Sequence, residues 1–162
     1  MDYRRARLDG GTYFFTVVTH NRLPLFGLAE NVERLKRALH HVKARYPFTM
    51  LAYVVLPDHL HCLWRLPAGD EDFSVRWRLV KQHVSHHAAP RPFWQKRFWE
   101  HLIRDEGDYQ RHLDYIHFNP VKHGRTDRAA NWPHSSFSEY VARGAYPADW
   151  GVAHEMEGEF GE

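Results

Sequence analysis

Two histidines separated by a single residue, His59 and His61, are the first side chains of this sequence that could do chemistry. They lie in a run that predicts a β-strand, in which successive side chains alternate between the two faces. Both imidazoles therefore project from one face. The residues Leu60, Cys62 and Trp64 project from the other. With backbones about 6–7 Å apart, two imidazoles can lean onto one divalent metal ion. The competing interpretation is coincidence, because 14 histidines in 162 residues yield about one such pair by chance.

A tyrosine and an asparagine four residues apart, Tyr115 and Asn119, are the second candidates. A helix beginning at residue 105 or 106 is predicted to end at Asn119, because the residue before Pro120 disfavours the α region. Residues four apart lie on one face of a helix, and His112 shares that face. The ordinary alternative is a core tyrosine with its hydroxyl at the rim. Tyr109 is a competitor, but it lies about 120° away around the helix and cannot serve the same site equally well.

Charge is unevenly distributed along the chain. Residues 1–100 hold 16 Lys and Arg against 9 Asp and Glu, whereas residues 101–162 hold 6 against 11. Within residues 73–104, seven basic residues alternate with six Phe and Trp. Basic residues interleaved with aromatic rings suit a polyanion with stackable bases, which describes single-stranded nucleic acid. The alternative is a solvated surface above core aromatics. The arginines near the N-terminus form a basic arm or, alternatively, a solubilising tail.

The elements that would position these groups alternate between strands and helices. The apolar and β-branched patterns predict strands at residues 12–19, 48–56, 59–66 and 94–104, and helices at 28–46, 73–87, 105–119 and 135–142. Because only Pro57 and Asp58 join the second and third strands, these two should form an antiparallel hairpin. The pattern favours an α+β fold, an antiparallel sheet with helices packed mainly on one face.

The length of 162 residues favours one domain, residues 1–150, followed by an acidic tail over residues 151–162. The apolar runs are too short to span a membrane, and no apolar core of a signal peptide follows the first charges. The single cysteine, Cys62, excludes an internal disulfide and a cysteine-cluster metal site. A Gly-rich phosphate loop, a nucleophile elbow and a His-Glu-x-x-His helix are absent. These features predict a soluble cytoplasmic protein.

Two segments, Val55–Trp64 (VLPDHLHCLW) and Asp114–Gly124 (DYIHFNPVKHG), resemble motifs of the HUH single-strand transposases of insertion sequences. They are most similar to the branch called REP-associated tyrosine transposases. Further similarity runs through residues 10–16, 73–78 and 94–101, so that it covers nearly the whole chain. The motifs are highly specific in this combination and order. The resemblance implies a ferredoxin-like α+β fold with an HUH-type active site.

By this resemblance, His59 and His61 correspond to paired metal ligands on a central strand, and Tyr115 to the nucleophile on a facing helix. Asn119 stands where insertion-sequence relatives supply a glutamine as third ligand, and its shorter side chain reaches the ion directly or through a water. The implied ion is Mg²⁺ or Mn²⁺, and two imidazoles suit Mn²⁺ better. The implied reaction is attack of the phenolate on a metal-bound phosphodiester, which yields a 5′-phosphotyrosine and a free 3′-OH.

The implied partner is a DNA hairpin with a short single-stranded flank, of the repetitive extragenic palindromic type. Duplex stems would be held through phosphates, and unpaired bases would stack on aromatic rings. We therefore expect DNA contacts from Arg4, Arg5, Arg7, Arg76, Arg78, Lys81, Trp94, Lys96, Arg97 and Lys122. Because imidazoles gain charge, binding should tighten below about pH 6.5. The branch implies a monomer rather than a homodimer, located at the nucleoid.

Two alternatives from other classes stay open. A domesticated DNA-binding protein would keep the basic surface without cleaving, and a generic two-histidine metallohydrolase would act on small phosphodiesters without a covalent intermediate. The glutamates of the tail (Glu155, Glu157, Glu159 and Glu162) could occupy the basic surface in place of DNA phosphates, or simply solvate the C-terminus.

Overall fold

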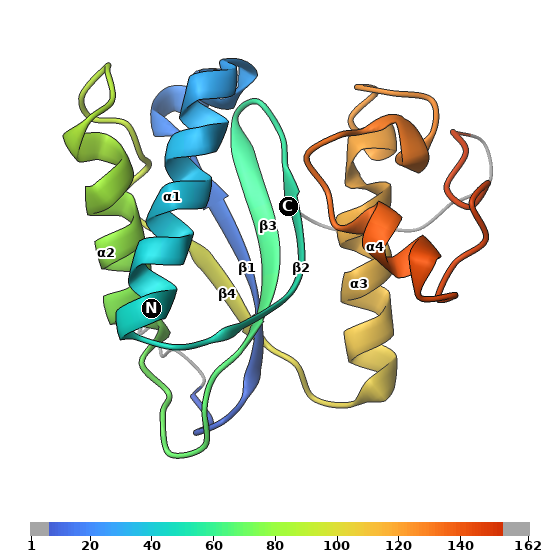
Figure 1. Ribbon diagram of the computed structural model, residues 1–162, viewed down its shortest axis with the longest axis horizontal. Helices are drawn as coiled ribbons and strands as arrows, with labels where there is room; N and C mark the ends of the chain where they lie inside the picture. The colour runs from blue at the N-terminus through green and yellow to red at the C-terminus, as the bar shows by residue number, and fades with distance from the viewer. Residues whose placement is uncertain (1–6, 154–162) are drawn as a thin grey trace, which may run out of the picture.

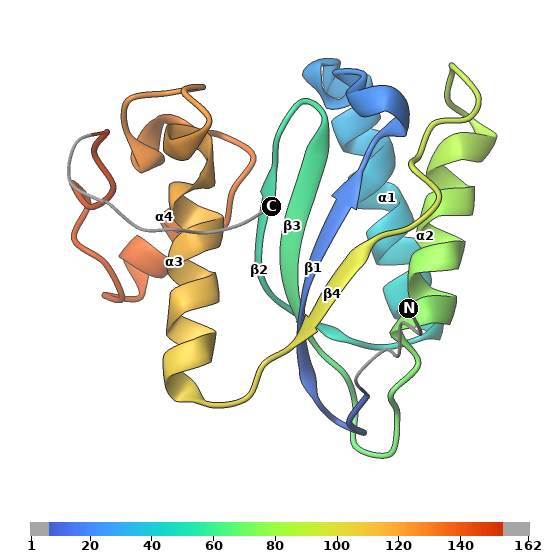
Figure 2. The same cartoon turned by 180° about the vertical axis from the view of Figure 1, so that it is seen from behind.

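A four-stranded antiparallel sheet in the order β2-β3-β1-β4 is the centre of the computed structural model, which describes residues 7–153 (Figure 1, Figure 2). The strands are β1 (Thr12–Val18), β2 (Thr49–Val55), β3 (His59–Arg65) and β4 (Trp99–Leu102). The α-helices are α1 (Ala29–Arg45), α2 (Phe73–His86), α3 (Glu106–Lys122) and α4 (Phe137–Ala142). Short 3-10 turns cover His20–Arg22, Leu25–Gly27 and Ala129–Asn131. The predicted α+β class and the β2–β3 hairpin are confirmed.

Helices α1 and α2 cover one face of the sheet (Figure 1). Alternate strand residues build this face, among them Tyr13 and Phe15 of β1 and Cys62 and Trp64 of β3, all fully buried. The indole of Trp64 stacks on that of Trp77 in α2, with ring centroids 4.4 Å apart. Each such buried large side chain stabilises the fold by roughly 1.5–3 kcal/mol. This layer holds the sheet rigid behind the histidine pair.

Helices α3 and α4 lie over the opposite face (Figure 2), so the helices are divided between both faces instead of lying mainly on one. The reason is that β1 is nearly continuously apolar, and a strand without polar alternation needs cover on both sides. Phe14 and Leu63 of the sheet share one buried cluster with Leu113 and Ile116 of α3. Helix α3 packs mainly on β2 and β3, the half of this face away from β4.

Two elements differ from their predicted bounds by more than two residues. The expected strand over residues 94–104 contains only the four residues of β4, because β4 is an edge strand that pairs with β1 alone. Helix α3 continues past Pro120 to Lys122. A proline removes one helical hydrogen bond, but Phe118 and Val121 are buried around it. Packing of this last turn therefore outweighs the local preference that predicted an end at Asn119.

The first residues of the predicted tail, 151–153, pair with the rest of the chain. Val152 forms a β-bridge with Arg128, and the backbone N–H of Ala153 donates to the carbonyl of Asp127 at 3.1 Å. These bonds make residues 151–153 part of the fold. Residues 154–162, with all four tail glutamates, lie outside the described residues. None of the helices in residues 7–153 is long and apolar enough to cross a membrane.

Candidate active site

The histidine pair lies on the face of the sheet that α3 covers. His59 and His61 stand opposite Val18 and Thr16 of β1, and their ring centroids are 4.8 Å apart. Both side chains are buried. Leu60 and its neighbours on the opposite side join the other core. Both imidazoles therefore project from the same face of β3, as the alternation along the strand predicted.

Each imidazole is held through its Nδ1 atom. His59 Nδ1 lies 2.7 Å from an Asp58 carboxylate oxygen, and His61 Nδ1 lies 2.8 Å from the Thr16 hydroxyl. The Arg22 guanidinium also donates to Asp58, at 3.3 Å. Burial by itself would raise the pKa of Asp58, but the hydrogen bonds and charges of His59 and Arg22 hold it below its usual value. These contacts restrict ring rotation, so that a ligand would be met through Nε2.

Tyr115 of α3 lies against this pair. Its ring is edge-on to His61, with centroids 5.1 Å apart, and 5.9 Å from Phe14. The Lys122 ammonium lies 4.9 Å from the centre of the same ring. Tyr115 is only 2% exposed. The structure thus brings the tyrosine and the histidines together.

The competing tyrosine of the same helix points elsewhere. Tyr109 is half-buried and lies with Tyr140 of α4, where the two side chains share a hydrogen bond that raises the pKa of Tyr140 in addition to burial. The six-residue separation from Tyr115 accounts for this direction, because it turns the side chain about 120° around the helix. Of the two candidates, Tyr115 is the one in contact with the histidine pair.

Two further groups near the histidine pair come from the last turn of α3 and from the residue that caps its C-terminus. Asn119 is fully buried, and its backbone carbonyl accepts the N–H of His123 at 3.0 Å. The ring of His123 lies 5.1 Å from that of His59. Sequence reasoning overlooked His123 as a site residue, although it belongs to the second motif. The signal that could have found it is its position, one turn after Asn119 on the same helix.

These residues fit a divalent metal ion. Two imidazoles and a side-chain amide offer nitrogen and oxygen donors, and the atoms concerned, His59 Nε2 and Asn119 Oδ1, are buried. Histidines that bind metals usually give their other ring nitrogen to a carboxylate or hydroxyl, as Asp58 and Thr16 provide here. An N,N,O set suits Mn²⁺ and Mg²⁺, with the imidazoles favouring Mn²⁺.

A second group of possible ligands, His101, Asp108 and His112, has donor atoms within 4.8 Å of one another. The Asp108 carboxylate already bonds His101 Nε2 at 2.8 Å and the Arg111 guanidinium at 2.9 Å. It also accepts the backbone N–H of Arg104, at 3.0 Å. Burial would raise the pKa of Asp108, but these donors hold it well below its usual value. With its charge balanced by arginine, Asp108 joins β4 to α3 and sets the position of the tyrosine helix.

Positive charge gathers on the opposite side of the sheet. A groove of about 1080 Å³ lies between α1, α2 and the segment 91–98. We call it the basic groove. It is lined by five cations and four histidines, with no acidic side chain among its described lining residues: Arg45, Arg78, Lys81, Arg91, Lys96, His41, His83, His86 and His87. Four residues predicted to contact DNA, Arg78, Lys81, Trp94 and Lys96, are thus brought together.

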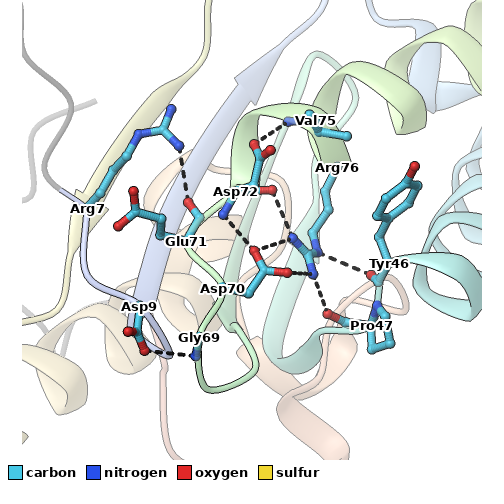
Figure 3. A network of polar contacts seen from close by, with 10 residues as sticks. All are labelled: Arg7, Asp9, Tyr46, Pro47, Gly69, Asp70, Glu71, Asp72, Val75 and Arg76. Atoms are coloured by element: carbon cyan, nitrogen blue, oxygen red, sulfur yellow. Dashed lines mark hydrogen bonds and ion pairs between the residues drawn. The ribbon is translucent and has the colours of Figure 1, made fainter.

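Arg76 does not belong to this surface, contrary to the prediction. Figure 3 shows its guanidinium enclosed by oxygen atoms. It forms two bonds to the Asp70 carboxylate, at 2.8 and 3.0 Å, and donates to the carbonyls of Tyr46, Pro47 and Asp72. It is 1% exposed. Its spacing suggested a cation on the helix surface, but Arg76 lies on the buried side of α2 and ties that helix to the end of α1.

Trp94 lines the basic groove but is largely buried, so little of its ring is open for stacking. It is 8% exposed, lies among Phe26 and Phe93, and donates its indole N–H to the Lys81 carbonyl at 3.1 Å. This bond fixes the segment after α2 against that helix. The apolar ring gains more from burial than from standing in water.

The other predicted DNA-binding residues are dispersed. Arg7 reaches α2, donating to the Glu71 carbonyl at 3.2 Å and the Ser74 hydroxyl at 3.0 Å. Arg97 is exposed beside the basic groove, and Lys122 lies at Tyr115. Arg4 and Arg5 lie outside the described residues.

A scan of the chain against protein-family models finds no match. The REP-associated tyrosine transposase of Escherichia coli (strain K12) is 49% identical over 149 residues, which cover 92% of this chain and 90% of that protein. A solved structure, that of a REP-associated tyrosine transposase bound to a REP hairpin, has a TM-score of 0.88 and 46% identity, and the match covers 96% of this chain and 94% of that one. Both similarities extend over nearly the whole chain.

Proposed function

Because this chain belongs to the REP-associated tyrosine transposase family, we propose that it cuts and rejoins single-stranded DNA at hairpin sequences through a covalent bond to Tyr115. The observation that carries the proposal is the contact between the Tyr115 ring and His61, on the face where His59 also lies. The relative solved with a REP hairpin supports a DNA hairpin as the partner.

In the proposed reaction, the Tyr115 oxygen attacks the scissile phosphorus and the bond from phosphorus to the 3′ oxygen breaks. The phenol loses its proton and the 3′ oxygen gains one, so one phosphoester replaces another without ATP. The Lys122 ammonium, 4.9 Å from the ring centre, places a positive charge beside the attacking side chain. Attack by the 3′-OH of another strand on the phosphotyrosine reverses these steps and joins the DNA.

A divalent ion, Mg²⁺ or Mn²⁺, held by His59, His61 and Asn119 would supply charge that offsets the negative charge developing on the phosphate oxygens. The contribution of the chain is to hold these side chains still. Asp58 and Thr16 fix the two rings through Nδ1, and such outer partners raise ligand affinity by orienting the first donors. His61, held by Thr16, also packs against the Tyr115 ring. The same side chain therefore orients the nucleophile.

The basic groove is proposed to hold phosphates of the hairpin. Its cations project from three segments and face a common space without acidic neighbours. Such contacts position a duplex without reading its sequence. Arg97 and the arm residues Arg4, Arg5 and Arg7 would extend this contact. Residues 1–150, extended to Ala153 by the backbone pairing described above, would act as one monomeric catalytic domain.

The test is a labelled hairpin oligonucleotide incubated with the full chain and Mn²⁺, followed by a denaturing gel. We expect a covalent protein–DNA adduct in the wild type and its complete loss in Tyr115→Phe, because phenylalanine has no attacking oxygen. Tyr109→Phe is the matched control on the same helix and should form the adduct normally. An adduct that persists in Tyr115→Phe contradicts the proposed role of this residue.

The 2% exposure of Tyr115 favours one second candidate, a hairpin-binding protein that does not cleave. In that case the hydroxyl stays inaccessible to a phosphate. Hairpin binding without nicking in Mn²⁺ or Mg²⁺ would support this candidate over the first.

A further inference from the structure

Trp99 is the one exposed aromatic ring among the Phe, Tyr and Trp side chains of residues 7–153, with 57% of its surface open to solvent. A single exposed apolar residue is ordinary on a protein surface and needs no functional explanation. The position of Trp99 in the sheet is what separates it from the exposed leucines.

Trp99 lies in the same cross-strand row as the histidine pair. It stands directly opposite Thr16 of β1, and Thr16 stands directly opposite His61 of β3. Directly opposed residues of antiparallel strands project to the same face. Adjacent strands are about 4.8 Å apart, which puts the Trp99 backbone about 10 Å from that of His61. The middle residue of the row, Thr16, bonds His61 Nδ1 at 2.8 Å.

The half of this face around Trp99 is the part that α3 covers least. Helix α3 packs mainly on β2 and β3, whereas β4 is the edge strand on the other side of β1. Two exposed cations are tied to the same strand through Asp108, which bonds His101 of β4. Arg104 and Arg111, both anchored to Asp108, keep 67% and 54% of their side chains exposed. His101 follows two residues after Trp99, on the same face of β4.

An exposed indole in the row of His61, with exposed cations tied to the same strand, matches one chemical class of ligand. Bases of single-stranded DNA stack on aromatic side chains while nearby cations hold their phosphates. We propose that Trp99 binds an unpaired nucleobase next to the scissile phosphate and so fixes the strand on Tyr115. This inference rests on the proposed function, and it adds a base-binding residue to the same site.

The test measures coupling between the indole and individual bases. Hairpins are prepared with one abasic site at a time in the unpaired nucleotides on either side of the cleavage position. Binding is followed by fluorescence anisotropy in a Tyr115→Phe background, which prevents cleavage. We expect one abasic position to weaken binding about tenfold. Trp99→Ala should weaken binding of the intact hairpin by the same factor. In this variant, the abasic site at that position should cause no further loss of affinity.

Trp99→Phe keeps a stacking face and should retain most of the affinity. Leu28→Ala is the matched control, because Leu28 is a similarly exposed apolar side chain, at 53%, placed at the start of α1. It should leave affinity and the abasic profile unchanged. Thermal unfolding of each variant separates lost stacking from lost structure.

The outcomes distinguish this inference from the proposed function. Equal losses for wild type and Trp99→Ala at every abasic position, together with a normal Tyr115 adduct, overturn the stacking role and leave the strand-transfer proposal intact. Coupling at one position in the binding assay supports the stacking role even when no adduct forms with the active chain. In that case it is the strand-transfer proposal that fails.

Discussion

The candidate site on the α3 face of the sheet and the basic groove beside α1 and α2 are built in opposite ways. On the α3 face, the candidate catalytic groups His59, His61 and Tyr115 are buried, and each histidine has a named partner that limits its rotation. On the α1–α2 side, the basic groove consists of long cationic side chains and histidines around an open space. One side of the molecule holds buried groups in fixed positions, and the other carries positive charge around an open space.

This difference predicts which variants change the rate of cleavage and which change the affinity for DNA. Chemistry at phosphorus depends on sub-ångström placement, which only buried and hydrogen-bonded groups provide. Attraction of a polyanion depends on summed charge, which tolerates mobile side chains and is screened by salt. Variants on the first face should therefore change cleavage with little effect on binding, and variants in the groove should do the reverse.

The largest effect is expected from His61→Ala. Loss of this imidazole removes a metal donor and the ring against which Tyr115 packs, so cleavage should fall by about 1,000-fold or more. Hairpin affinity in the absence of metal should change less than about twofold. His40→Ala, an exposed histidine of α1, is the control. Cleavage rates and anisotropy measure both quantities, and an equal loss of binding and cleavage in His61→Ala contradicts the division between faces.

Two arginines of α2 sharpen the comparison within one helix. Arg76→Met should lower the free energy of unfolding by about 2–4 kcal/mol, because Asp70 and three carbonyls lose a buried donor. Arg78→Met should change stability by less than about 0.5 kcal/mol. It should instead weaken hairpin binding a few-fold and reduce the salt dependence by about one counterion. Urea unfolding measures the stability of both variants, and salt titrations measure their hairpin binding. Lost stability in Arg78→Met together with lost binding in Arg76→Met would show that the groove is misassigned.

A smaller effect is expected at Thr16. Thr16→Val removes the hydroxyl that bonds His61 Nδ1 but keeps the shape of the side chain. Loss of such an outer partner usually costs about 10- to 100-fold in metal affinity or activity. The Mn²⁺ concentration required for half-maximal cleavage should rise, and saturating Mn²⁺ should restore part of the rate. An unchanged Mn²⁺ requirement would argue against His61 as a ligand.

The smallest effect is a pH dependence of the basic groove. Burial and the charges of neighbouring cations lower the pKa of His83 in the free protein. Phosphates favour the protonated imidazole, so binding takes up protons and affinity rises as pH falls. Because the pKa of His83 is lowered, the rise is expected below about pH 6.5. The groups that face it are His41 and Arg37 of α1, His86 of α2 and the following His87.

The measurement for this prediction is hairpin affinity between pH 5.5 and 8, compared between wild type and His83→Gln. The variant should flatten the curve by a few-fold at the acid end and leave affinity at pH 8 unchanged. A curve that is identical in both proteins assigns the pH dependence to other histidines.

Predictions from sequence succeeded where a short-range rule governs direction. The two-residue period of a strand assigned His59 and His61 to one face, and helical spacing separated Tyr115 from Tyr109. They failed for side chains that have both polar and apolar parts, because such side chains can be either buried or exposed. Arg76 and Trp94 read as a DNA-binding surface, but a guanidinium can be buried among carbonyls and an indole among phenyl rings.

The sequence by itself determined the class of fold, the two motifs and the candidate side chains for the chemistry, because these depend on residue types and on spacing of a few positions. Only the tertiary structure decided that helices cover both faces, that Trp99 stands in the row of His61, and that Thr16 and Asp108 hold the site together. Those relations join residues tens of positions apart. Their partners are selected by strand register and by burial of the whole core, which no local pattern encodes.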